Sequence, residues 1–260
     1  MSAETVTGTG PAVPRSYGEA LRALGSKQKT AKGAPAYSRF VNRRAGRHLA
    51  AGAYVLGLTP NQVTGISALF TFAGIATVAL AEPSPVTGVL VALALMIGYA
   101  FDSADGQLAR LRGGGSKAGE WLDHMVDATK ISSLHLAVLV SFYRFSGLPD
   151  AALLVPIGFT VVAAVMFFGM ILNDLLRRAH YAASGTLPAA PARPSSLRSL
   201  LVIPTDYGLL CLAFALLGVD GAFPYVYGLL FAANLAFMLA AAVKWFRDIA
   251  SLDATPVGED

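Results

Sequence analysis

Four aspartates stand close together in a chain that is otherwise rich in apolar residues. Asp102 and Asp105 are three positions apart, and Asp123 and Asp127 are four positions apart. On a helix, either spacing places both carboxylates on one face. If the two helices fold back on each other, the four carboxylates meet and repel one another unless cations neutralise them. Hard oxygen ligands in this number suit one or two Mg²⁺ or Mn²⁺ ions.

A purely structural role for the four aspartates is the alternative. An ionised aspartate at membrane depth costs about 2.5–3.5 kcal/mol even on a lenient insertion scale, so each would need a cationic partner. The basic residues that lie close in sequence are Arg110, Arg112, Lys117 and Lys130. We therefore favour a metal site, with Lys130 as a counter-ion for the carboxylates or as an anchor for an acceptor phosphate.

This arrangement resembles the signature of the CDP-alcohol phosphotransferases, a family of integral membrane enzymes that make phospholipids and related phosphodiesters. The signature reads Asp-x₂-Asp-Gly-x₂-Ala-Arg-x₈-Gly-x₃-Asp-x₃-Asp, and the chain matches all of its fixed positions. In this sequence they are Asp102, Asp105, Gly106, Ala109, Arg110, Gly119, Asp123 and Asp127. A motif of this length is far more restrictive than a lone glycine-rich loop.

The resemblance implies a reaction in which one phosphate ester is exchanged for another. An acceptor hydroxyl attacks the β-phosphorus of a CDP-alcohol, and CMP leaves. The family pattern implies two Mg²⁺ or Mn²⁺ ions, held by Asp102, Asp105 and Asp123, which would clamp the diphosphate and stabilise the departing oxygen. It leaves Asp127 as a metal ligand, as the base that takes the acceptor proton, or as both.

The small and basic positions of the motif have physical reasons of their own. Gly106 and Gly119 lack side chains, so that the nucleotide or a neighbouring helix can approach the backbone closely. Ala109 is small and lies on the same stripe as Asp102. Arg110 lies eight positions after Asp102, again on that face, where its guanidinium could hold a phosphate. An interfacial cation is the alternative for Arg110.

Asn61 and Thr64 extend the expected nucleotide site to the first apolar stretch. The segment Pro60-Asn61-x-x-Thr64 resembles the Pro-Asn/Asp-x-x-Thr start that is common in the family. Pro and Asn are also ordinary residues at the start of a helix. Nucleotide contact and helix initiation both remain open for this segment.

Glu120 and His124 are the candidates, beside Asp127, for acid–base work. They are four positions apart, so the carboxylate can orient the imidazole. The segment Gly-Glu-x-x-Asp-His resembles the version in choline and ethanolamine phosphotransferases, where such a His is assigned to acceptor activation. Because a metal-bound Asp127 has little affinity for a proton, we favour His124 as the base. The alternative is a polar pair without chemistry.

Residues around the end of the fourth apolar stretch, and one at the start of the fifth, are candidates for the acceptor site. They are Asn173, Asp174, Arg177, Arg178, His180 and Asp206. Phosphatidylinositol-phosphate synthases in this family carry a basic cluster on these later elements. The Arg177–Arg178 pair also suits a cytosolic stop signal, and the sequence does not identify the donor or the acceptor alcohol.

The composition predicts an all-α integral membrane protein. The 260 residues are 55% hydrophobic and 14% charged, and the mean hydropathy is +0.56. Six apolar stretches are long enough, or nearly so, to span about 30 Å of hydrocarbon. We place these six transmembrane helices near 62–81, 86–110, 121–145, 151–176, 202–218 and 222–244. The fifth of them is the shortest.

The expected organisation has one membrane domain and two tails. Residues 1–35 are predicted as a disordered cytosolic tail, because they are rich in Gly, Ala, Thr and Lys. Residues 36–58 are predicted as an interfacial amphipathic helix, with arginines on one stripe and apolar residues on another; a solvated cytosolic helix is the alternative. Residues 59–247 form the six-helix catalytic domain, and 248–260 form a second cytosolic tail.

The distribution of positive charge predicts the orientation. Nine of the 20 Lys and Arg residues precede residue 48, whereas the expected loops at 82–85, 146–150 and 218–221 contain none. The positive-inside rule therefore places both termini and the active site on the cytosolic side of the cell membrane. The net charge of +4 is explained by topology and by attraction to anionic lipid, and it does not indicate a nucleic-acid partner.

Two other classes of protein also place carboxylates in a membrane. An ion or metal transporter typically shows paired repeats and interrupted helices, and no repeat is evident here. A non-catalytic relative of the family would be expected to lose an Asp, and none is lost. The expected partners are a CDP-alcohol donor and an alcohol acceptor, one of them a lipid. A homodimer is a further expectation, since many members of the family are dimers.

Overall fold

The architecture is helical throughout the part of the chain that the structure describes. This computed structural model describes residues 14, 16–26, 35–185, 203–219 and 221–253. Within these ranges the regular elements are helices, and no strand is present. The predicted all-α fold class is confirmed.

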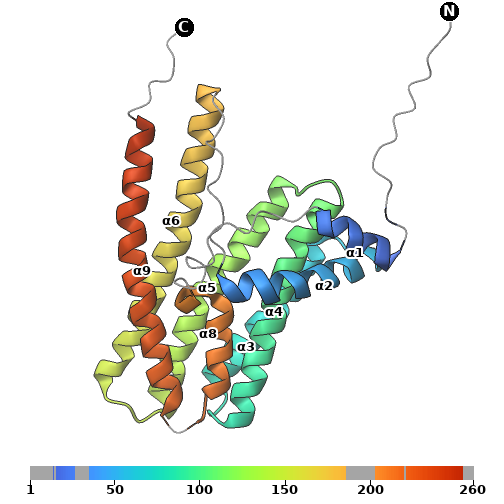
Figure 1. Ribbon diagram of the computed structural model, residues 1–260. Helices are drawn as coiled ribbons and strands as arrows, with labels where there is room; N and C mark the ends of the chain where they lie inside the picture. The colour runs from blue at the N-terminus through green and yellow to red at the C-terminus, as the bar shows by residue number, and fades with distance from the viewer. Residues whose placement is uncertain (1–13, 15, 27–34, 186–202, 220, 254–260) are drawn as a thin grey trace, which may run out of the picture.

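Five helices in this part are long and apolar enough to cross a membrane (Figure 1). They are α3 (Pro60–Leu80), α4 (Pro85–Leu111), α5 (Lys117–Phe145), α6 (Leu154–Ser184) and α9 (Ala222–Asp253). They correspond to five of the six expected spans, and α6 and α9 continue beyond the expected ends at 176 and 244. In Figure 1, the free ends of α6 and α9 project well past the rest of the bundle.

The remaining expected span, the fifth at 202–218, is not confirmed as a full crossing. Residue 202 lies outside the described residues, and the helical part of this segment consists mainly of α8 (Tyr207–Ala213) and the short helix η4 (Phe214–Leu216). At 1.5 Å per residue, these elements together cover about half of the hydrocarbon thickness. The turn after them is fixed by close packing, because Gly218 has a φ of +88° and a Cβ there would lie 2.3 Å from the Ser84 backbone.

The N-terminal segments are more ordered than the sequence predicted. A helix, α1 (Tyr17–Ser26), lies inside the expected disordered tail and buries Ala20 and Leu24, so the prediction for 1–35 is wrong at these residues. The sequence of the tail does not reveal this helix, because its two apolar residues are buried only by packing against α2 and α4. The short helix η1 (Ser38–Asn42) and α2 (Arg43–Val55) occupy the expected amphipathic segment; its place at the membrane interface stays a prediction.

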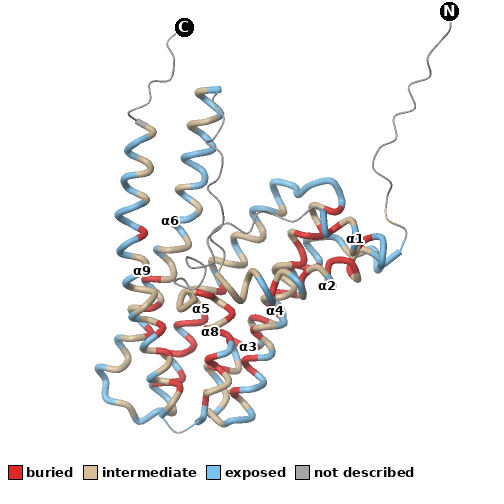
Figure 2. The backbone as a smooth tube through the Cα atoms, in the orientation of Figure 1, coloured by how far each residue is buried: buried red, intermediate tan, exposed pale blue. Residues whose placement is uncertain are grey.

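Two apolar cores lie at different levels of the bundle (Figure 2). One joins α3, α4, α5, α6, α8 and α9 in the lower half of the view. The other joins α1 and α2 to the C-terminal half of α4. The upper parts of α6 and α9 are mostly exposed. The motif helix α4 thus takes part in both cores, and its polar turns lie between them.

The reversal between α4 and α5 is built from glycine and a helix cap. Gly113 and Gly114 have backbone φ values of +100° and +136°, which residues other than glycine rarely adopt. The Ser116 hydroxyl then accepts a hydrogen bond from the Gly119 N–H at 3.0 Å and starts α5. Helix α3 packs against both α4 and α5, so it serves as the common support of the two motif helices.

Asp206 ties the N-terminal segment to α8. Its carboxylate is buried and accepts hydrogen bonds from the N–H groups of Tyr37 at 2.8 Å, Ser38 at 3.2 Å and Gly208 at 3.0 Å. The side chain of Asn42 donates to the Tyr99 carbonyl of α4 at 3.1 Å. Asp206 was a candidate for the acceptor site, but the structure places it in this backbone clamp instead.

We expect Asp206→Ala to destabilise the protein, because three backbone N–H groups lose their acceptor in a buried site. Each unsatisfied group costs about 1–3 kcal/mol, so the thermal unfolding midpoint in detergent should fall clearly. Asp206→Asn keeps one acceptor oxygen and should be milder. Asp150→Ala, at an exposed position, is the matched control. An equal midpoint for Asp206→Ala and Asp150→Ala would contradict the clamp.

Candidate metal centre

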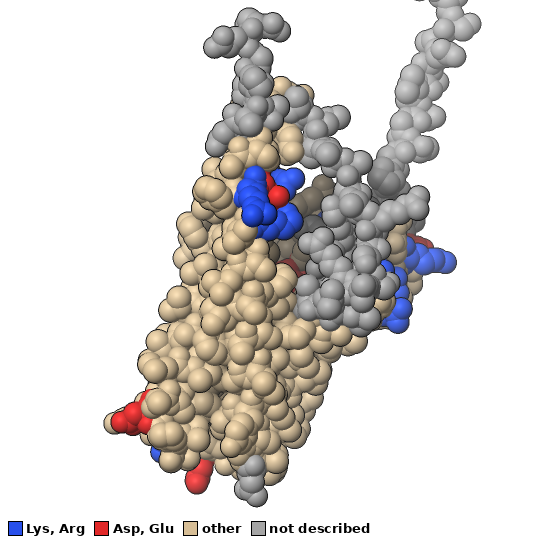
Figure 3. Space-filling model, turned by 60° about the vertical axis from the view of Figure 1, so that its left-hand side comes forward, with Lys and Arg blue, Asp and Glu red and all other residues tan. Residues whose placement is uncertain are grey.

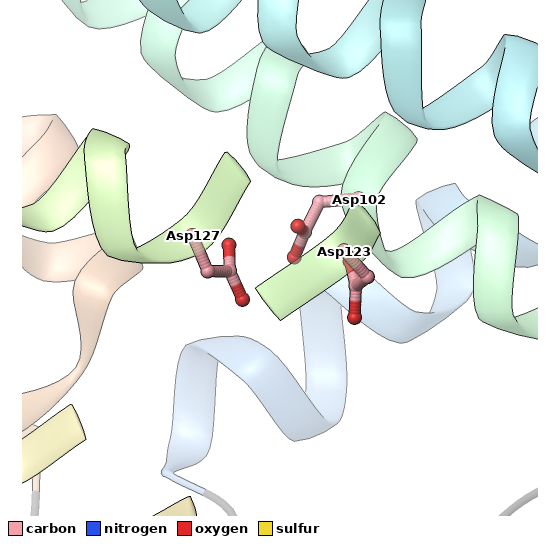
Figure 4. A group of neighbouring side chains, drawn as sticks. All are labelled: Asp102, Asp123 and Asp127. Atoms are coloured by element: carbon pink, nitrogen blue, oxygen red, sulfur yellow. The ribbon is translucent and has the colours of Figure 1, made fainter. Parts of the chain in front are cut away.

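Three aspartates from two helices converge on one point. Asp102 of α4 and Asp123 and Asp127 of α5 each offer a carboxylate oxygen, and these oxygens all lie within 4.8 Å of one another. Figure 4 shows the three side chains directed toward a common space. Each carboxylate is half-buried, so the group is neither sealed in the core nor fully solvated. This donor set fits a hard divalent cation, which prefers carboxylate oxygens.

Asp105, the fourth aspartate of the motif, stands outside this group. It is 6% exposed; its Oδ2 accepts a hydrogen bond from the Thr64 hydroxyl at 2.6 Å and its Oδ1 one from the Gly106 N–H at 2.5 Å. The expected pool of four carboxylates is therefore corrected to a group of three with a fourth beside it. Two residues that are three positions apart on a helix differ in direction by about 60°. This rotation turns the Asp105 side chain away from Asp102 and toward α3.

Lys130 supplies the counter-charge that the sequence suggested. Its Nζ lies 2.5 Å from Asp127 Oδ1 and 3.4 Å from Asp102 Oδ1. It therefore bridges two of the three converging carboxylates, one on each motif helix. The aromatic ring of Tyr207 in α8 lies 5.2 Å from the same Nζ; the sequence offered no signal for this contact.

The start of α3 brings the two remaining expected nucleotide residues to the site. Thr59 and Gln62 form a reciprocal capping box, which fixes where the helix begins. Asn61 then lies over the start of α5, since a Cβ on Gly119 would be 3.1 Å from Asn61 Oδ1. Thr64 is buried, and its hydroxyl holds Asp105. The structure thus places Thr64 behind a carboxylate rather than at an open surface.

Arg110 and its small neighbours lie at the end of α4. A Cβ on Gly106 would be 3.5 Å from Arg110 Nη1, so the guanidinium lies along the glycine. Ala109 faces the turn, where a Cβ on Gly115 would be 3.9 Å from the Ala109 methyl group. Gly106, Ala109 and Arg110 are each half-buried, and nucleotide contact at these positions stays a prediction.

Glu120 and His124 do not form the expected hydrogen-bonded pair in the described part of the chain. Glu120 Oε1 accepts from Arg178 Nη1 of α6 at 3.2 Å. The His124 ring contacts Phe167 edge-on, with 6.2 Å between the ring centroids, and its Nδ1 is buried without a hydrogen-bond partner. Helix α6 lies beside α5, and its Arg178 and Phe167 contact Glu120 and His124. Spacing along α5 alone could not predict these contacts.

The other acceptor-site candidates lie on the projecting part of α6. Asn173 donates to the Gly169 carbonyl at 2.6 Å, and Asp174 pairs with Arg178 at 2.5 Å. Arg177 is exposed, and His180 contacts Tyr181. Exposed ion pairs of this kind contribute at most about 1 kcal/mol. Among these residues, Arg178 is joined to α5 by an ion pair, with Glu120 at 3.2 Å.

The fold and the site define a multi-pass helical membrane protein with a cluster of three carboxylates between two helices. A family model described as CDP-alcohol phosphatidyltransferase matches residues 57–246. The match covers most of the chain, and the protein belongs to this family and is a CDP-alcohol phosphotransferase. The resemblance seen in the Asp102–Asp127 motif is confirmed. Members of the family work in phospholipid synthesis, with CDP-alcohol donors and alcohol acceptors.

Similar solved structures include three crystal structures of phosphatidylinositol phosphate synthase (PgsA1) from Mycobacterium tuberculosis. The one with CDP-DAG bound is 20% identical, with 79% of this chain and 94% of that chain covered and a TM-score of 0.49. The complex with manganese and citrate has 20% identity, coverage of 76% and 87%, and a TM-score of 0.47. The apo form has 23% identity, coverage of 74% and 91%, and a TM-score of 0.45. No curated protein matches the chain.

We expect Thr64→Val to reduce transferase activity by about tenfold or more, because the Asp105 carboxylate loses the hydroxyl that holds it and a buried charged acceptor is left short of a donor. Thr64→Ser should retain most of the activity. Thr77→Val is the matched control, since that hydroxyl lies on the same helix and bonds only within it, to the Ala73 carbonyl at 2.8 Å. Equal turnover by Thr64→Val and Thr77→Val would show that the contact does not matter.

Proposed function

We propose that the protein transfers a substituted phosphate group from a CDP-alcohol to an acceptor alcohol, with release of CMP and with a bound divalent cation. The observation that carries this proposal is the convergence of Asp102, Asp123 and Asp127 within 4.8 Å, inside a complete family motif. Mg²⁺ or Mn²⁺ would be held by these three carboxylates. When bound, the metal would supply positive charge that offsets the charge on the donor diphosphate.

We assign the residues around the carboxylates to different parts of the donor. Arg110 extends along Gly106 at the end of α4, where its fork of donors suits a phosphate oxygen. Asn61 and Gly119 meet at the starts of α3 and α5, and we assign them to the nucleotide. We retain Asp105 as a ligand of a second ion, because Thr64 fixes its direction and it lies one turn from Asp102.

We assign removal of the acceptor proton to His124. It follows Asp123 in the chain, and its Nδ1 has no hydrogen-bond partner in the described part of the protein, so this nitrogen is not committed to another group. Asp127 is already engaged by Lys130 at 2.5 Å. Because Glu120 pairs with Arg178, its role in this proposal is to hold α6 beside the site and not to orient the imidazole.

The charge distribution supports a cytosolic active site in the cell membrane. In Figure 3, basic side chains gather near the upper end of the molecule, and acidic side chains are prominent at the lower end. The exposed basic residues on the projecting helices include Arg178 of α6 and Lys244 of α9. By the positive-inside rule, this end faces the cytosol, where a water-soluble nucleotide has access to the carboxylates.

The test is a matrix of donors and acceptors with the purified protein. CDP-diacylglycerol is combined with soluble alcohols, and CDP-choline with diacylglycerol, each with Mg²⁺, with Mn²⁺ or with a chelator. We expect at least one pair to release CMP, and only with both metal and acceptor present. Asp123→Asn should lower the rate by at least about 100-fold, whereas Asp150→Asn at the opposite end should not. CMP release that persists in the chelator would contradict the proposal.

The donor and acceptor that prove active in this matrix also serve to test His124. His124→Ala should lower kcat while the metal concentration for half-maximal rate stays unchanged, because the ring accepts a proton and does not hold the ion. Asp127→Asn should change both quantities. Wild-type kcat in His124→Ala would return the role of base to Asp127.

A further inference from the structure

We propose that Lys130 is a resident cation of the carboxylate site, which stabilises the site in the absence of a metal and competes with the metal for it. The inference rests on the metal binding in the proposed function. It adds a residue outside the family motif, which sets how strongly the site holds its ion.

The contacts of Lys130 place its charge among the converging carboxylates. The side chain is 8% exposed, and its Nζ lies 2.5 Å from Asp127 Oδ1 and 3.4 Å from Asp102 Oδ1. In the described part of the chain, no other ion pair involves either of these aspartates. One buried ammonium therefore links the two motif helices at the point where a divalent cation would also link them.

An aromatic ring also contacts the ammonium. The ring of Tyr207 lies 5.2 Å from Lys130 Nζ, a distance typical of a cation–π contact. Tyr99 of α4 packs edge-on against Tyr207 at 5.0 Å between centroids, and Tyr37 stacks on Tyr99 at 6.3 Å. Three tyrosines from separate elements thus form a row of ring contacts, and the Tyr207 end of this row touches Lys130. The short α8 contributes the ring that touches it.

The two roles of Lys130 result from its charge. Without a metal, the ammonium offsets the repulsion between Asp102 and Asp127, and its removal leaves buried carboxylates uncompensated. With a divalent cation on the same carboxylates, the ammonium and the metal repel each other at short range, and low solvent exposure leaves this repulsion weakly screened. The same charge therefore stabilises the metal-free protein and weakens metal binding.

The experiment measures thermal unfolding of the full chain, purified with Mn²⁺ and then divided between a chelator and a Mn²⁺ series. For Lys130→Met, we expect a midpoint in the chelator at least about 5 °C below that of the wild type. Mn²⁺ should raise its midpoint by more than it raises the wild-type midpoint. The Mn²⁺ concentration for half of this effect should be about tenfold lower than for the wild type.

Leu134→Ala is the matched control, because Leu134 lies one turn further along α5 and is 1% exposed. It should lower the midpoint equally in the chelator and in Mn²⁺, since it removes packing and no charge. Tyr207→Leu provides a second variant that keeps the lysine: loss of the ring should reproduce the Lys130→Met pattern to a smaller extent, while Tyr207→Phe should behave as the wild type.

The possible outcomes separate this inference from the proposed function. If Mn²⁺ does not change the wild-type midpoint, the metal site of the proposed function is wrong, and the inference with it. If Mn²⁺ stabilises the wild type but stabilises Lys130→Met by the same amount or less, only the inference is overturned. If Lys130→Met yields no folded protein, a wild-type Mn²⁺ response in Tyr207→Leu overturns the inference.

Discussion

The structure depends on how negative charge is balanced inside an apolar helical bundle. Three carboxylates converge within 4.8 Å, and a fourth lies beside them in contact with Thr64. Such a group is unstable in a membrane protein unless cations and hydrogen-bond donors face it. Among the described residues, the buried ammonium of Lys130 on α5 and the buried hydroxyl of Thr64 on α3 face these carboxylates.

The smaller elements make sense as supports of this charge balance. Helix α8 is too short to cross the hydrocarbon on its own, yet it supplies the Tyr207 ring beneath Lys130. Asp206, immediately before that ring, anchors the segment that leads into α2. Asn42 fastens the same segment to α4. A layer of N-terminal and α8 residues thereby holds both the motif helix and the lysine in place.

Local spacing predicted the parts of the site that depend on one helix at a time. The Asp123–Asp127 pair, Lys130 as a counter-ion and most of the spans could be predicted from periodicity and hydropathy. The predictions that failed all concern contacts with a second helix. Glu120 meets Arg178 of α6 rather than His124, and Asp105 turns toward α3. Likewise, α1 becomes ordered by packing on α2 and α4, contacts that spacing along one segment does not reveal.

The most direct test of the metal centre is the stoichiometric binding of Mn²⁺ to the purified protein, monitored by electron paramagnetic resonance of the free ion. We expect tight binding to the wild type, strong loss in Asp102→Asn and Asp123→Asn, and unchanged binding in Asp174→Asn, whose carboxylate is exposed on α6. Wild-type Mn²⁺ binding in both Asp102→Asn and Asp123→Asn would contradict the claim that the carboxylates of α4 and α5 form one metal centre.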